Sequence, residues 1–87
     1  MMFKKAAKEH AIKEAPKESC GIVVNDDFAI HPKDFLKARS KGRLQYIVHS
    51  HPDGGDASEP DKKACTATKI PWYIYLLPKD TWQTINP

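Results

Sequence analysis

Hydrophobic residues recur along the 87-residue chain with two different periods, and the two periods predict different elements. Phe3, Ala7 and Ala11 recur every three to four residues among alanines, lysines and glutamates, which predicts a helix that Pro16 ends. The apolar run 20–24 is rich in β-branched residues and therefore predicts a buried strand. The first quarter of the chain thus predicts a helix followed by a strand.

Six further elements follow from the same patterns. They are a strand at 28–30, a helix at 35–40, a strand at 44–48, a helix that begins at Ser58 and runs to 65 or 68, and strands at 71–77 and 81–85. This order predicts an α/β fold with a single small mixed sheet flanked by helices. The length suits one hydrophobic core, and no repeat or linker interrupts it, so we expect a single domain over residues 1–87.

Composition excludes several classes of protein. Apolar residues make up 40% of the chain and charged residues 29%, as in ordinary globular proteins. The longest apolar run, 72–77, is far shorter than the roughly 20 residues that cross a bilayer. No apolar stretch follows the first residues, so we expect neither a membrane span nor a secretion signal. A net charge of +3 is too small to indicate nucleic-acid binding.

The two cysteines, Cys20 and Cys65, lie far apart and form no CxxC motif. Without an export signal, we expect two free, buried thiols that bind no metal, and a disulfide between them stays open as the alternative.

One segment, 46–61, combines histidines with acidic residues and contains no lysine or arginine. Strand residues two apart share a side of the sheet, so His49 and His51 can aim at one point where Pro52 ends the strand at a sheet edge. A catalytic zinc has three protein ligands and an open position, and neutral imidazole is a good ligand. Asp61 is the natural third ligand, because the glycine-rich loop before it can fold back toward the histidines.

The start of the following helix also has a purely structural interpretation. Ser58 suits the N-cap, Pro60 suits the first turn, and acidic residues there favour the positive end of the helix dipole. Capping and coordination are compatible, since Asp61 can bind an ion while Ser58 caps the helix.

The motifs become specific when they are taken together. They are Glu18-x-Cys20-Gly21 before the first strand, His49-Ser50-His51-Pro52 at the end of the third, and Ser58-x-x-Asp61 at the next helix. This set resembles the JAMM (MPN+) zinc metallopeptidases. The flanking sequence is similar to the JAMM (Mov34/MPN/PAD-1) domain of phage tail assembly protein K-like proteins. The resemblance implies a JAMM/MPN, cytidine-deaminase-like architecture, shortened at 25–27 and 53–57.

The resemblance also implies roles for these residues. His49, His51 and Asp61 would hold one Zn²⁺ per chain, Glu18 would act as the general acid/base, and Ser58 would stabilise the oxyanion. The chain is then a hydrolase, a zinc-dependent metalloprotease or isopeptidase associated with the phage tail, which cleaves a cell-wall peptide or a tail protein.

Such domains are often joined to an NlpC/P60 peptidase, so this peptidase and other tail proteins are the expected partners, and the host cytoplasm or the virion tail is the expected location. Two alternatives stay open. One is a structural tail component with a zinc-stabilised but weakly active or inactive site, and the other is a cellular JAMM enzyme that processes ubiquitin-like or sulfur-carrier proteins.

Overall fold

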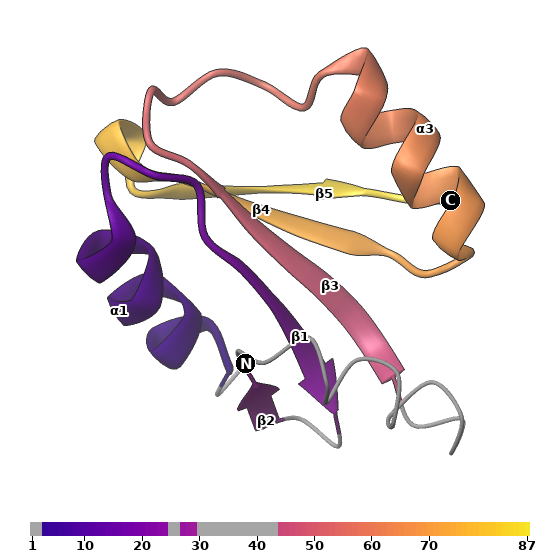
Figure 1. The fold of residues 1–87 in the computed structure, drawn as a ribbon, viewed down its shortest axis with the longest axis horizontal. Helices are drawn as coiled ribbons and strands as arrows, with labels where there is room; N and C mark the ends of the chain where they lie inside the picture. Colours follow the sequence, from indigo (N-terminus) through magenta and orange to yellow (C-terminus); the bar gives the residue numbers. More distant parts are fainter. Residues whose placement is uncertain (1–2, 25–26, 30–43) are drawn as a thin grey trace.

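A mixed sheet with a helix on each face forms the described part of the computed structural model, which comprises residues 3–24, 27–29 and 44–87 (Figure 1). The described elements are α1 (Phe3–Glu14), β1 (Cys20–Val24), β2 (Asp27–Ala29), β3 (Leu44–His51), α3 (Glu59–Thr68), β4 (Trp72–Leu76), the short 3₁₀ helix η1 (Leu77–Lys79) and β5 (Thr81–Ile85). The predicted α/β class, with one small mixed sheet flanked by helices, is confirmed. The helix predicted at 35–40 lies outside the described residues.

The five described strands are ordered β2-β1-β3-β4-β5, with β3 and β4 parallel and every other pair antiparallel. The segment 44–48 predicted as the third strand forms the first part of β3, which continues to His51, directly before the Pro52 that was expected to end it. Its pairing with β4 explains the extension, since His51 still lies opposite Leu76. Both histidines therefore lie at the C-terminal end of the central strand, and not on a strand at the side of the sheet.

Two clusters of buried residues hold the layers together. One contains Ile22, Ile47, Cys65 and Trp72, and the other contains Phe3, Ala7, Val23 and Val48. Residues next to each other along a strand point to opposite faces of the sheet, so the two clusters lie on opposite faces. The first cluster contains Cys65 of α3, and the second contains Phe3 and Ala7 of α1, so each helix covers one face. Each fully buried aliphatic side chain contributes about 1.5–3 kcal/mol through burial. The histidine pair shares the α3 face, because His49 is two residues after Ile47.

Both described helices begin and end close to the predicted residues. The first, α1, ends at Glu14, two residues before Pro16. The second, α3, has Ser58 as its N-cap. Its C-cap is Lys69, which follows Thr68 and adopts a left-handed conformation at φ 60°. Within the described residues, neither helix is long and apolar enough to cross a membrane.

Candidate metal centre

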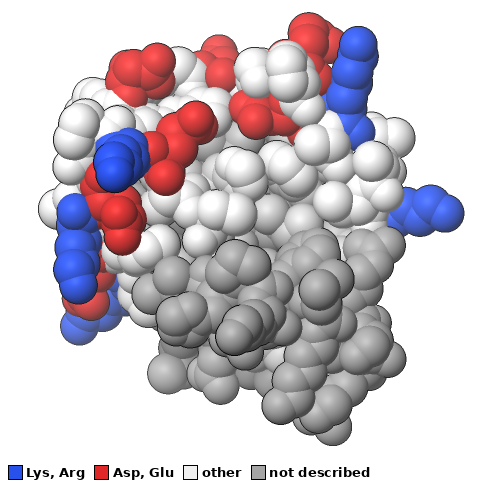
Figure 2. Space-filling model, in the orientation of Figure 1, with Lys and Arg blue, Asp and Glu red and all other residues white. Residues whose placement is uncertain are grey.

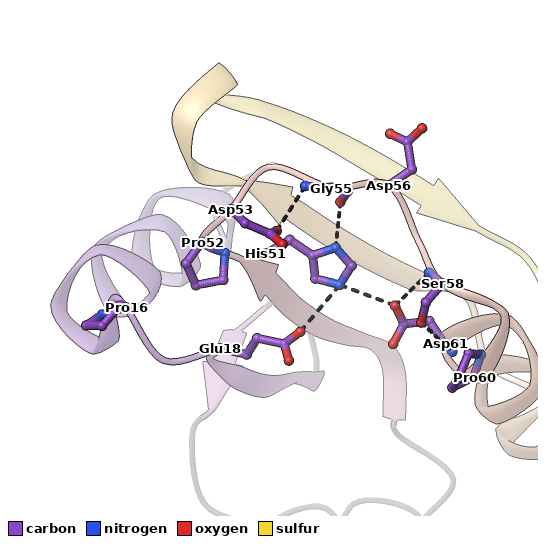
Figure 3. A pocket seen from close by; sticks show the side chains of 10 residues that line it. All are labelled: Pro16, Glu18, His51, Pro52, Asp53, Gly55, Asp56, Ser58, Pro60 and Asp61. Carbon is purple, nitrogen blue, oxygen red and sulfur yellow. Dashed lines mark hydrogen bonds and ion pairs between the residues drawn. The ribbon is translucent and has the colours of Figure 1, made fainter.

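The side chain of His51 is 9% exposed, and both of its ring nitrogens have defined neighbours (Figure 3). Its Nδ1 lies 2.6 Å from the backbone oxygen of Gly55. Because a carbonyl oxygen only accepts, Nδ1 carries a hydrogen and donates it. On the other side of the ring, Nε2 lies 3.2 Å from Asp61 Oδ2 and 3.4 Å from Glu18 Oε1. The ring is thus oriented with Nε2 facing two carboxylates.

The Nε2 side of the ring and the two carboxylates together offer lone pairs to a cation. With its hydrogen on Nδ1, a neutral imidazole has a lone pair on Nε2, and a lone pair is repelled by carboxylate oxygens at 3.2–3.4 Å. A metal ion bound between the ring and the carboxylates would remove this repulsion. Histidines that bind metals usually donate their other N–H to a carbonyl or carboxylate, as His51 does to Gly55.

Asp61 reaches this point from the first turn of α3. Its Oδ2 accepts a hydrogen bond from the backbone N–H of Ser58 at 3.0 Å, and its own N–H donates to Ser58 Oγ at 3.2 Å. The two residues form a capping box, so the carboxylate that faces His51 is held by the helix terminus itself.

Burial favours the neutral carboxyl of Asp61, but the interactions with Ser58 and the nearby histidines outweigh it and lower its pKa below the ordinary value. Asp61 is therefore charged at neutral pH and available to a cation. The sequence predicted that Ser58 caps the helix while Asp61 faces the histidines, and in the structure Asp61 contacts both Ser58 and His51.

Glu18 lies two residues before β1, and its side chain is 62% exposed. The next residue, Ser19, donates from its backbone N–H and its hydroxyl to Ser50 Oγ, at 2.7 and 2.9 Å. Ser50 is fully buried between the two histidines, and its own N–H donates to the Ser19 carbonyl oxygen at 3.1 Å. These three bonds tie the backbone that carries Glu18 to the strand that carries the histidines.

His49 lies on β3, two residues before His51. Its ring stacks on Trp72 with centroids 4.6 Å apart, and its Nε2 lies 3.7 Å from Cys20 Sγ. Burial lowers its pKa, although the nearby Asp61 and Glu18 carboxylates oppose the effect, so the ring is neutral at neutral pH. In the described ranges, no three His, Cys, Asp or Glu side chains are arranged to hold an ion as they stand.

The two cysteines are both free, as predicted, but they differ in exposure. Cys65 is buried in α3, whereas Cys20 is exposed, so the prediction that both are buried is wrong for Cys20. Cys20 is the first residue of β1 and lies opposite His49 in the sheet. The surroundings of its sulfur nevertheless raise the pKa of the thiol through desolvation.

A pocket of about 580 Å³ opens over His51. Its lining includes four of the predicted site residues, Glu18, His51, Ser58 and Asp61, together with two further carboxylates, Asp53 and Asp56, but no lysine or arginine. Figure 2 shows acidic side chains gathered along the side of the molecule where the loop between β3 and α3 runs. The charge of the pocket favours a cation.

Two contacts of the loop between β3 and α3 are not visible in the sequence. The Gly55 carbonyl orients His51, and the side chain of Gln83 on β5 accepts a hydrogen bond from the Ala57 N–H at 2.8 Å. A backbone carbonyl has no residue signature, and Gln83 is 26 positions from Ala57, so no local pattern could reveal either contact.

We compared the chain with known protein families, with known sequences and with solved structures. No model of a known protein family matches the chain. It is 35% identical over 97 residues to tail tip assembly protein K of Escherichia phage N15, covering 90% of this chain. The chain spans about two fifths (40%) of the length of that protein. The fold resembles the solution structure of protein DSY2949 from Desulfitobacterium hafniense, with a TM-score of 0.65, 20% identity, and coverage of 95% of this chain and 77% of that one.

Proposed function

We propose that this chain is a zinc-dependent peptidase or isopeptidase of the JAMM type that works with the phage tail. The observation that carries the proposal is the orientation of His51, whose Nδ1 donates to Gly55 while Nε2 faces Asp61 and Glu18. Two of the residues implied by the JAMM resemblance, Glu18 and Asp61, thus contact a third, His51.

The donor set fits zinc. Two imidazoles and one carboxylate, from His49, His51 and Asp61, are the ligand types of catalytic zinc sites and leave a position open. His49 is neutral and Asp61 is charged at neutral pH, which are the forms that bind metal. When bound, zinc would polarise the scissile carbonyl and lower the pKa of a water molecule.

The remaining chemistry belongs to Glu18 and Ser58. As the water oxygen attacks the carbonyl carbon, the Glu18 carboxylate takes a proton from the water and later donates it to the leaving amine nitrogen when the C–N bond breaks. Its 62% exposure on the pocket rim leaves it accessible to a substrate. Ser58 also lines the pocket, and its Oγ only accepts in the capping box, so its O–H can donate to the developing oxyanion.

The similarity to tail tip assembly protein K supports a role in the assembly or action of the phage tail. In that setting, the substrate is a cell-wall peptide or a tail protein, and the partners are other tail proteins or an NlpC/P60 peptidase. The virion tail or the cytoplasm of the bacterial host is the corresponding location.

A structural tail component is the second candidate function. Two observations favour it: His49 contacts Trp72 and Cys20, and no three potential metal ligands converge among the described residues. In this case, zinc would stabilise the domain but support little or no hydrolysis.

Replacing Glu18 with Gln separates the two candidates. Glutamine keeps the size of the side chain but cannot take the proton, so Glu18→Gln should keep one zinc per chain and lose cleavage by about 100-fold or more. Glu9→Gln, which removes an exposed acid from α1, is the matched control and should cleave like the wild type.

The substrates to compare are peptidoglycan stem peptides, isopeptide-linked peptides and a ubiquitin-like fusion protein. Cleavage of the fusion protein alone would favour the cellular JAMM enzyme. Equal cleavage by wild type and Glu18→Gln would refute the proposed mechanism, and zinc binding without any cleavage would favour the structural component.

A further inference from the structure

The loop between His51 and Ser58 is anchored to the β4–β5 hairpin at two places. Gly54 packs on Pro78 with φ at 78°, and an added Cβ there would lie 3.3 Å from the proline ring. At the other end of the loop, Gln83 Oε1 accepts the hydrogen bond from the Ala57 N–H. Ala57 directly precedes Ser58, the N-cap of α3, so Gln83 holds the chain at the point where the helix begins.

The strand register determines the position of Gln83 relative to His49. In the strand pairing, His49 lies opposite Ile74, and Ile74 lies opposite Gln83. The three residues form one row across β3, β4 and β5, and residues in such a row share a face of the sheet. Neighbouring strands are about 4.8 Å apart, which places the Gln83 backbone about 10 Å from that of His49. Ile74 is fully buried between them and keeps this spacing rigid.

A continuous series of contacts therefore joins the two halves of the candidate metal centre. It runs from the sheet to Gln83, from Gln83 to the Ala57 N–H, and through Ser58 to Asp61 in the capping box. Asp61 Oδ2, at the end of the series, lies 3.2 Å from His51 Nε2.

We infer that Gln83 is a positioning residue for the candidate metal centre, which holds the start of α3 so that the Asp61 carboxylate meets His51. Its role toward a metal rests on the proposed function, whereas its role in holding Asp61 does not. The feature that matters at this position is an acceptor oxygen within reach of the Ala57 N–H, which the Gln83 amide supplies and a glutamate carboxylate could supply as well.

The test compares three variants of the whole chain. Gln83→Met keeps the length of the side chain and removes the acceptor, and Gln83→Glu restores an acceptor. Thr84→Val changes the exposed neighbour on β5 and is the control. The first measurement is the rate of amide hydrogen exchange at Ala57 and Asp61, followed by NMR in the metal-free protein. The second is the zinc dissociation constant, determined by competition with a chromophoric chelator.

We expect Gln83→Met to speed exchange at both amides and to weaken zinc binding by about 10-fold or more, the usual size of an effect on residues that orient metal ligands. Gln83→Glu should return both quantities toward the wild-type values, and Thr84→Val should leave them unchanged. If Gln83→Met fails to fold, Gln83→Ser, whose side chain is too short to reach Ala57, takes its place.

Two results would overturn the inference. The first is that Gln83→Met shows the same exchange rate at the Asp61 amide and the same zinc affinity as the control Thr84→Val. The second is that Gln83→Met and Gln83→Glu weaken zinc binding equally. Failure of the proposed function has a different signature. In that case the wild type binds no zinc, yet Gln83→Met still speeds exchange at the Asp61 amide, and the positioning role stands.

Discussion

Asp61 has two roles in this structure, and a single substitution should separate them. Asp61→Asn keeps an oxygen that can accept the Ser58 N–H but removes the negative charge that faces His51. In the metal-free protein, we expect a loss of about 0.3–1 kcal/mol from the weakened interaction with the helix dipole. Ser58→Ala is the matched variant, because it removes the acceptor for the Asp61 N–H and leaves the carboxylate in place.

Zinc should make the two variants differ strongly. At a free zinc concentration 100 times its dissociation constant, binding stabilises the wild type by about 2.7 kcal/mol. If Asp61→Asn weakens binding 100-fold, the same concentration stabilises the variant by about 0.4 kcal/mol, a difference of about 2.3 kcal/mol. For a domain of this size, that is about 9–18 °C less zinc-induced rise in Tm. Ser58→Ala should lose about 1 kcal/mol both with and without zinc, so its zinc-induced rise stays the same.

The assay is thermal unfolding followed by circular dichroism, with and without buffered zinc, for the wild type and both variants. A zinc-induced rise in Tm that is equal in Asp61→Asn and the wild type would show that Asp61 is no ligand. A rise that shrinks equally in Ser58→Ala would show that the capping box, and not the carboxylate charge, couples this residue to the metal.

Three further predictions concern other parts of the chain. His51→Ala should abolish stoichiometric zinc in a metal analysis, and one equivalent retained would refute the ligand set. In the native protein, a thiol reagent should modify the exposed Cys20 well before the buried Cys65, and two equal rates would contradict the observed burial. The hydrogen bond from Lys8 lowers the pKa of Asp80, so this carboxylate stabilises the fold above its ordinary pKa of 3.8 and loses that effect as pH falls through the lowered value. The difference in urea stability between wild type and Asp80→Asn should therefore shrink on acidification below about pH 4, and a constant difference would refute the role.

The sequence alone determined the elements that depend on near neighbours. The spacing of Phe3, Ala7 and Ala11 predicted α1, and the run at Cys20–Val24 predicted β1. Ser58 was predicted as the N-cap of α3 from the residues within one turn of it, and the structure confirms it. The shared face of the two histidines followed from the two-residue period of a strand. In each case, the interaction that shapes the backbone lies within about four residues, so the pattern and the cause coincide.

Only the tertiary structure decided how these pieces meet. Pairing of β3 with β4 carried the strand through His51, and the exposure of Cys20 depends on what surrounds the start of β1. The bonds that place Glu18 beside His51 join Ser19 to Ser50, 31 positions away. A contact over such a distance depends on strand order, register and the packing of distant side chains together, and no local pattern in the sequence contains that information.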